Sequence, residues 1–228
     1  MIDVVRAAWL IARKDFTIEA RSREIIATAA FFAVACVLVF SFSLVTDGRA
    51  PDGVAAGVLW VGVAFSGTLS LGRLFERERA HDTLRTLLLA PVERPAVYLG
   101  KLLAVIMLMG AVGALLLPFT GFLFDQAVVR AAPWLAAVLL LGITGFAAIG
   151  TLFAAMLGRS RSRDVLLPVL LYPMSVPVLI AGVRATSALL EAAGPDFATA
   201  RMWMGVIAAF DAVFLTLALW TFEAVMEE

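Results

Sequence analysis

The sequence is poor in the residues that form metal centres and disulfides. Its 228 residues include one cysteine, Cys36, and one histidine, His81. A single cysteine cannot form a disulfide within the chain, and one cysteine with one histidine cannot complete a zinc or iron–sulfur ligand set. We therefore expect no metal site, and Cys36 is interpreted as a small packing residue of an apolar segment.

Motifs for nucleotide binding and hydrolysis are missing as well. The sequence has no GxxxxGK[S/T] phosphate loop, no HExxH and no GxSxG. These motifs bind nucleotide phosphates, hold a catalytic zinc and present a serine nucleophile. We therefore expect no ATPase site in this chain and predict that it is not an enzyme. The formal net charge of +0 gives no general basic surface, so we expect no nucleic-acid partner.

Charged residues are scarce, whereas apolar residues are abundant. Hydrophobic residues make up 62% of the chain and charged residues 16%, and the mean hydropathy is +0.98. Soluble domains are about half apolar and about a quarter charged. A water-soluble fold of this size has too little interior for so much apolar surface. The composition therefore predicts an all-α polytopic membrane protein, because helices satisfy their own backbone hydrogen bonds in lipid.

Six stretches are long and apolar enough to cross a bilayer, which needs roughly 20 helical residues. The predicted spans, all within one transmembrane permease domain over 1–228, are 25–45, 54–71, 102–124, 134–157, 165–183 and 205–222. The first begins too late and runs too long for a cleaved signal peptide.

The segment 1–24 is predicted to be an amphipathic helix lying at the membrane interface. Val5, Trp9 and Phe16 fall on one helical face, whereas Arg6 and Arg13 fall on another. An ordinary basic lead-in to the first span is the alternative interpretation.

Basic residues are distributed unevenly between the two sides of the predicted bundle. Fourteen of the 18 lie in the segments 1–24, 73–101 and 159–163. The other four are Arg49, Arg130, Arg184 and Arg201. Because basic residues accumulate on the cytoplasmic side, this pattern predicts that both termini are cytoplasmic.

The segment 73–101 is too charged to span a membrane and too apolar for a plain linker. Asp82 is suitably placed to cap a short helix that Pro91 would end. In an exporter whose ATPase is a separate subunit, such a helix would be the coupling contact. The alternative is a helix that lies on lipid headgroups. The candidate ATPase-coupling residues are Phe75, Glu76, Glu78, Arg79, Asp82, Leu84, Leu87 and Leu88.

Three prolines interrupt the fifth predicted span. Pro168, Pro173 and Pro177 each remove a backbone donor, and Gly182 follows them. This pattern predicts a broken or re-entrant helix that transmits motion. A kinked packing helix is the alternative.

Asp211 lies in the first half of the sixth predicted span. An ionisable residue at that depth faces the interior of the bundle or a cavity. Since no second ionisable residue lies at the same depth, a hydrogen-bonded structural carboxyl is favoured over a proton relay.

Three stretches resemble the CcmB family, the haem exporter protein B of cytochrome c maturation, which is a permease of the ABC transporter class. They are LSLGRLFERERAHDTLRTLLLAP (69–91), PAVYLGKLL (95–103) and PMSVPVLIAG (173–182). The last resembles the family's proline-flanked PVLIFG signature. The resemblance runs from end to end. One departure is that His81-Asp82 and Leu84-Arg85 stand where the family tends to carry Asp-Gly and Leu-Glu, and it concerns the residue-level contacts of the loop with its ATPase, not the role of the loop.

The resemblance implies a set of partners in a bacterial inner membrane. These are a CcmA-type ATPase, CcmC- and CcmD-type membrane subunits and a CcmE-type haem chaperone, whose haem-loaded form is released by ATP hydrolysis. ATP would act through the partner and haem would be handled by the complex, with two copies of this chain expected. An exporter of another cargo and a non-transporting assembly scaffold are the alternatives, and a stand-alone secondary transporter is a more distant one.

Overall fold

The computed structural model describes residues 3–45, 51, 53–80, 94–124, 128–157, 160, 162–191 and 194–225. Within these ranges the chain is helical and contains no strand. The elements are α1 (Val4–Ser22), α2 (Glu24–Leu44), α3 (Val54–Ala80), α5 (Arg94–Leu123), the short 3₁₀ helix η1 (Val128–Ala131), α6 (Ala132–Met156), α7 (Arg163–Leu189) and α8 (Phe197–Val225).

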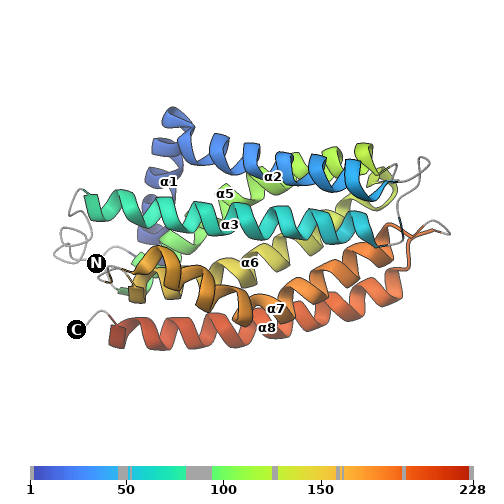
Figure 1. The fold of residues 1–228 in the computed structure, drawn as a ribbon. Coiled ribbons are helices and arrows are strands. Elements are labelled where there is room, and N and C mark those ends of the chain that lie inside the picture. Colours follow the sequence, from blue (N-terminus) through green and yellow to red (C-terminus); the bar gives the residue numbers. More distant parts are fainter. Residues whose placement is uncertain are drawn as a thin grey trace.

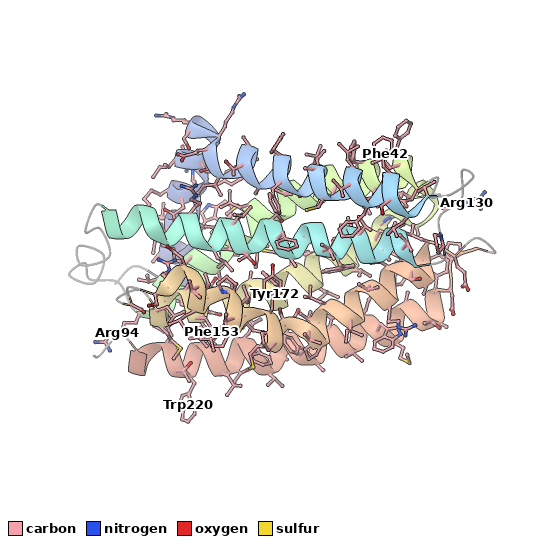
Figure 2. The ribbon with its side chains drawn as sticks, in the orientation of Figure 1. Phe42, Arg94, Arg130, Phe153, Tyr172 and Trp220 are labelled. Atoms are coloured by element: carbon pink, nitrogen blue, oxygen red, sulfur yellow. The ribbon has the colours of Figure 1, made fainter. Side chains whose placement is uncertain are left out.

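The six long helices run side by side, and α1 lies across one end of them (Figure 1). Each of α2, α3, α5, α6, α7 and α8 is long and apolar enough to cross a membrane. Large apolar side chains also face outward, with Phe42 at 83% and Trp220 at 77% exposure, and both project from the bundle in Figure 2. The chain is therefore a multi-pass membrane protein, and the predicted all-α fold with six spans is confirmed.

A sharp corner at Arg23 makes α1 turn away from the direction of α2. Arg23 has a φ of 55° and is the only residue between the two helices. Its backbone N–H donates to the carbonyl of Glu19 at 2.6 Å, as in a left-handed helix cap. The expected N-terminal helix is therefore present, and it lies at an angle to the bundle (Figure 1).

Two helices extend into the segment that the sequence suggested to be a loop. α3 continues to Ala80, and α5 begins at Arg94 instead of near Leu102. The early start of α5 is possible because Pro95 occupies its first turn, where a missing backbone N–H costs no intrahelical hydrogen bond. Residues 73–80 and 94–101 of the expected 73–101 loop are therefore helical.

The centre of the bundle is formed by α3 and α6. In the most apolar part of each of these two helices 67% of the residues are buried. The corresponding share is 28% in α2 and 17% in α8. Trp60 of α3 is 2% exposed, and its indole N–H donates to the hydroxyl of Thr186 in α7 at 2.9 Å. Its ring lies over Gly142 and Gly182, where an added Cβ would overlap the indole atoms. These glycines allow α3, α6 and α7 to meet around one aromatic side chain.

The expected break in the fifth span is wrong, because α7 is one continuous helix that contains Pro168, Pro173 and Pro177. The helix bends instead (Figure 1). Pro173 and Pro177 are exposed on the outer side of the bundle, and α3, α6 and α8 pack against α7. Packing on the inner side therefore holds the helix together where single backbone hydrogen bonds are lost.

Candidate functional site

One end of the bundle brings together α1, the last turns of α3 and the first turns of α5 and α7; we call it the α1 end (Figure 1). Here α1 lies against α5 at very short range. A Cβ built on Gly100 would lie 2.7 Å from Cβ of Ile11 and 2.9 Å from the carbonyl oxygen of Ala8. Gly100 therefore permits a helix contact that any larger residue would push apart.

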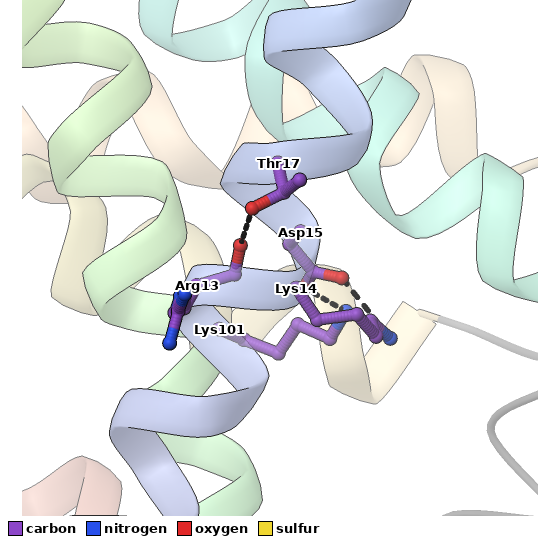
Figure 3. A network of polar contacts seen from close by, with 5 residues as sticks. All are labelled: Arg13, Lys14, Asp15, Thr17 and Lys101. Carbon is purple, nitrogen blue, oxygen red and sulfur yellow. Dashed lines mark hydrogen bonds and ion pairs between the residues drawn. The ribbon is translucent and has the colours of Figure 1, made fainter.

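A buried ion pair joins the same two helices (Figure 3). The Lys101 ammonium of α5 donates to Oδ2 of Asp15 in α1 at 2.6 Å, and the two side chains are only 3% and 6% exposed. Lys14 lies 3.1 Å from the other carboxylate oxygen and is 45% exposed. Removing a charge from water is costly, so a pair buried this deeply persists only in a well-defined geometry. It therefore fixes the position of α1 on α5.

Glu19 connects α1 to α2. Its side chain is fully buried, and Oε1 accepts hydrogen bonds from the backbone N–H groups of Ile25 at 2.6 Å and Ile26 at 2.9 Å. The first N–H groups of a helix lack intrahelical partners, and the helix dipole favours a negative charge beside them. Glu19 therefore caps α2 from the preceding helix.

Replacing Glu19 tests this cap. Glu19→Ala removes both hydrogen bonds and is expected to lower the free energy of unfolding by about 1 to 2 kcal/mol, whereas Glu19→Gln keeps an acceptor oxygen and should lose less. Thermal unfolding in mild detergent, followed by circular dichroism, measures both. Thr28→Ala, on the exposed side of α2, is the control. Equal melting temperatures for Glu19→Ala and Thr28→Ala would contradict the assignment.

Two further polar contacts link the spanning helices at the α1 end. Arg163, at the start of α7, is 5% exposed, and its Nη2 donates to the carbonyl of Leu71 in α3 at 3.4 Å. The Tyr98 hydroxyl of α5 donates to the carbonyl of Ala148 in α6 at 3.0 Å. Together with Lys101 these side chains form a polar layer that cross-connects the helices next to the segment between α3 and α5.

Sequence reasoning missed the polar layer. In the sequence, Lys101 and Arg163 indicate only the orientation of the chain, and Asp15 and Glu19 fall within the amphipathic segment 1–24. Their position at the edge of apolar runs was the available signal. The burial of Lys101 and Asp15, however, depends on α1 lying on α5, and that of Arg163 on α7 packing beside α3, which no local pattern reveals.

Some of the predicted coupling residues lie at the α1 end, and the others fall outside the described residues. Phe75, Glu76, Glu78 and Arg79 belong to the last turns of α3. The remaining four, Asp82, Leu84, Leu87 and Leu88, fall within 81–93, outside the described residues. Their role in coupling stays a prediction, and so does the short helix expected there.

Asp211 lies away from the polar layer, between α8 and α6. It is 6% exposed, and among the described residues its Oδ1 has no hydrogen-bond partner. The carboxyl faces Gly145, where a Cβ would overlap Oδ1. The hydrogen bond expected from the sequence is therefore not seen for this oxygen. Because α6 from Ala132 to Met156 contains no charged residue, the site also lacks the second ionisable group that a relay across α6 would need.

Gly182, predicted to act with the prolines, lies instead against the indole of Trp60. It is a close-packing position of α7, at the point where the side chain of α3 enters between α6 and α7.

Known proteins are similar to this chain along nearly its whole length. The family described as "CcmB protein" matches residues 6–228. The "Heme exporter protein B" of Paracoccus denitrificans is 35% identical over 195 residues, which cover 86% of this chain and 85% of that protein. That of Haemophilus influenzae is 31% identical over 186 residues, covering 81% of each. That of Rhodobacter capsulatus is 33% identical over 155 residues, covering 68% of this chain and 70% of the relative.

Proposed function

Since this chain belongs to the CcmB protein family, we propose that it is the membrane permease subunit of an ABC-type exporter that handles haem in cytochrome c maturation. The observation that carries the proposal is the family match over residues 6–228, together with relatives named as haem exporters. The six membrane-spanning helices are what a permease requires.

The orientation proposed for the chain puts the α1 end in the cytoplasm of a bacterial cell, with the protein in the inner membrane. Basic side chains support it, because Arg13, Lys14, Arg73, Arg94 and Lys101 all belong to helix segments at the α1 end. Arg94 and Arg130 lie at opposite ends of the bundle (Figure 2).

The coupling step is proposed to enter through the segment 81–93. A CcmA-type ATPase that binds this segment would pull on the end of α3 and the start of α5, which it connects. Because Lys101 and Gly100 tie the start of α5 to α1, α1 would move with α5 as one unit. The polar layer is thus the part of the bundle best suited to pass on a displacement.

The remaining partners of the complex follow from family membership as proposals. They are CcmC- and CcmD-type membrane subunits and a CcmE-type haem chaperone, with two copies of this chain per complex and ATP hydrolysis driving release of the loaded chaperone. Direct haem ligation by this subunit is not proposed, because His81 is its only histidine.

Leu87→Asp tests the proposed docking segment. A charge on the apolar face of the expected helix should weaken ATPase binding at least about tenfold without affecting membrane insertion, because a few buried contacts carry most of the binding energy of an interface and a buried unpaired charge is costly. Co-purification of the ATPase with the tagged chain in mild detergent measures it. Thr86→Asp introduces the same charge on the opposite face of the expected helix and should leave binding unchanged. Equal recovery with both variants would refute this docking surface.

The function itself is tested by identifying what co-purifies with the wild-type chain. Mass spectrometry of the purified complex, with a haem absorbance scan, should find an ATPase and a haem-handling membrane subunit. Recovery of an ATPase without haem-handling partners would indicate an exporter whose cargo is not haem. Absence of any ATPase, under conditions that preserve other complexes, would contradict an ABC permease and favour an assembly scaffold.

A further inference from the structure

A pocket of about 740 Å³ opens at the end of the bundle opposite α1. It lies between the start of α3, the end of α7 and the start of α8, and its lining includes Ala56, Arg184, Glu191 and Trp203. Its volume is within the range of about 300 to 1,000 Å³ that is common for small-molecule sites. The polar layer is at the other end, so this pocket plays no part in the proposed coupling.

The polarity of the pocket changes in order along α7. Ile180, Arg184 and Glu191 all line it, and the first two are one turn apart on the same side of α7. Ile180 is nearest the middle of the bundle, Arg184 is one turn further out, and Glu191 lies just past the helix end at Leu189. From inside to outside, the wall is therefore apolar, then cationic, then anionic. With a rise of 1.5 Å per residue, Arg184 lies about 7.5 Å along the axis from the helix end at Leu189, and Glu191 follows beyond that end.

The wall formed by α8 continues this arrangement. Asp196, Thr199 and Trp203 line the pocket at helical spacing. Hydrogen bonds from the side chain and backbone of Thr199 lower the pKa of Asp196, so this carboxylate is ionised at neutral pH. Asp196 also accepts hydrogen bonds from the backbone N–H groups of Ala198 and Thr199 at 3.0 and 3.1 Å. The outer part of the pocket thus carries two carboxylates, and its middle one guanidinium.

Aromatic residues mark the depth of the pocket in the membrane. Trp134 and Phe197, at the starts of α6 and α8, pack with ring centroids 5.5 Å apart and ring planes tilted by 48°, and Trp203 lies on the pocket wall. Aromatic side chains of this kind collect at the level of lipid headgroups. The charged part of the pocket is therefore at headgroup level. Ile180 lies deeper, on the side of the pocket that faces the acyl chains.

The order of groups matches one class of molecule. A phospholipid with an amine in its head presents acyl chains, then a phosphate, then an ammonium, which complement an apolar, a cationic and an anionic wall in the same order. A molecule with two carboxylates, such as haem, would meet one cation and two anions here, and like charges at short range are repulsive. The pocket therefore does not suit a dianion.

We propose that this pocket is a headgroup site for phospholipids that carry both a phosphate and a primary ammonium, with Arg184 contacting the phosphate and Glu191 the ammonium. Trp203, seven residues past Asp196 and so about 10 Å deeper along α8, adds an aromatic wall on the membrane side of the two carboxylates. The inference is independent of the proposed function, since it concerns the opposite end of the bundle and requires no ATPase.

Native mass spectrometry of the delipidated full chain tests the site. The chain is mixed with equal amounts of dioleoyl phosphatidylethanolamine and dioleoyl phosphatidylglycerol, which differ only in the head. We expect the wild type to retain at least fivefold more of the amine lipid. Arg184→Gln should lose at least fivefold of both lipids, whereas Glu191→Gln should lose only the preference for the amine.

Matched variants separate the pocket from general surface charge. Arg201→Gln and Asp164→Asn remove a cation and an anion from exposed positions that do not line the pocket, and both should bind like the wild type. If Arg184→Gln fails to fold, Ser187→Leu fills the pocket without changing its charge and should also abolish retention. Equal retention of both lipids by the wild type, wild-type binding by Arg184→Gln or Ser187→Leu, or displacement of the amine lipid by equimolar haemin would each overturn the proposal.

Discussion

Gly142→Ala is expected to lower the free energy of unfolding by about 2 to 3 kcal/mol, the upper range for overpacking a well-packed core. Ala is otherwise the better helix residue, so propensity alone predicts the opposite sign. The reason is the indole of Trp60, which occupies the space where the methyl group would be placed. Because Trp60 also bonds to Thr186 at 2.9 Å, the ring cannot move aside without losing that hydrogen bond.

Gly110→Ala is the matched control for this experiment. Gly110 is also in the interior of a spanning helix, but no atom lies within 4 Å of an added Cβ. Its replacement should therefore leave stability unchanged or raise it by up to about 1 kcal/mol. Thermal unfolding of both variants in the same detergent, followed by circular dichroism, gives the comparison.

Trp60→Leu provides the second arm of the test. A smaller side chain at position 60 leaves room for a methyl group, so Gly142→Ala should cost clearly less in that background than in the wild type. Such non-additivity is the mark of a direct contact. If Gly142→Ala lowers the free energy of unfolding equally in both backgrounds, or behaves like Gly110→Ala, then Trp60 does not pack against α6 as described.

Lys101→Met is expected to destabilise the chain by about 3 kcal/mol, at the lower end of the 3 to 5 kcal/mol that breaking a buried pair costs. The methionine keeps the length of the side chain but leaves the carboxylate of Asp15, 6% exposed, without its buried cation. Lys14 stays 3.1 Å away, which is why we expect the lower value. We also expect α1 to become accessible to proteases, since it would be held less firmly on α5.

Lys14→Met is the control for charge at the same carboxylate. Its side chain is 45% exposed, and exposed ion pairs contribute less than about 1 kcal/mol. A double-mutant cycle of Lys101→Met with Asp15→Asn should show strong coupling, because each change removes the same contact. Additive effects, or equal costs for the two lysines, would show that the pair does not hold α1 in place.

The fold could be predicted from the sequence because the lipid bilayer restricts which secondary structure can cross it. A chain with 62% hydrophobic residues must expose apolar surface to lipid, and continuous apolar runs of roughly 20 residues satisfy their backbone hydrogen bonds there as helices. The helix ends were less predictable. The third span was expected to begin at 102, yet α5 begins at Arg94 with Pro95 in its first turn, where proline is well tolerated. The three prolines of α7 bend the helix without breaking it, because packing partners rather than local propensity decide the outcome.

The contacts that organise the bundle could not be predicted, since they join residues far apart in the sequence. Asp15 and Lys101 are 86 positions apart, and Trp60 and Thr186 are 126 apart. Charge patterns along the sequence indicate a side of the membrane, but not which charges become buried together. The candidate coupling segment stays a prediction, and it could be made because its signal is local: leucines at positions 84, 87 and 88, the capping residue Asp82 and the proline Pro91.

The distance in sequence between Asp15 and Lys101 also sets an order for biosynthesis. At about 5 to 20 residues per second, a ribosome needs roughly 4 to 17 seconds to add the 86 residues that separate them. During that interval α2 and α3 are made while Asp15 of α1 still lacks its buried partner Lys101. The helix made first is therefore among the last to reach its final position, and a nascent chain stalled before α5 should carry α1 undocked.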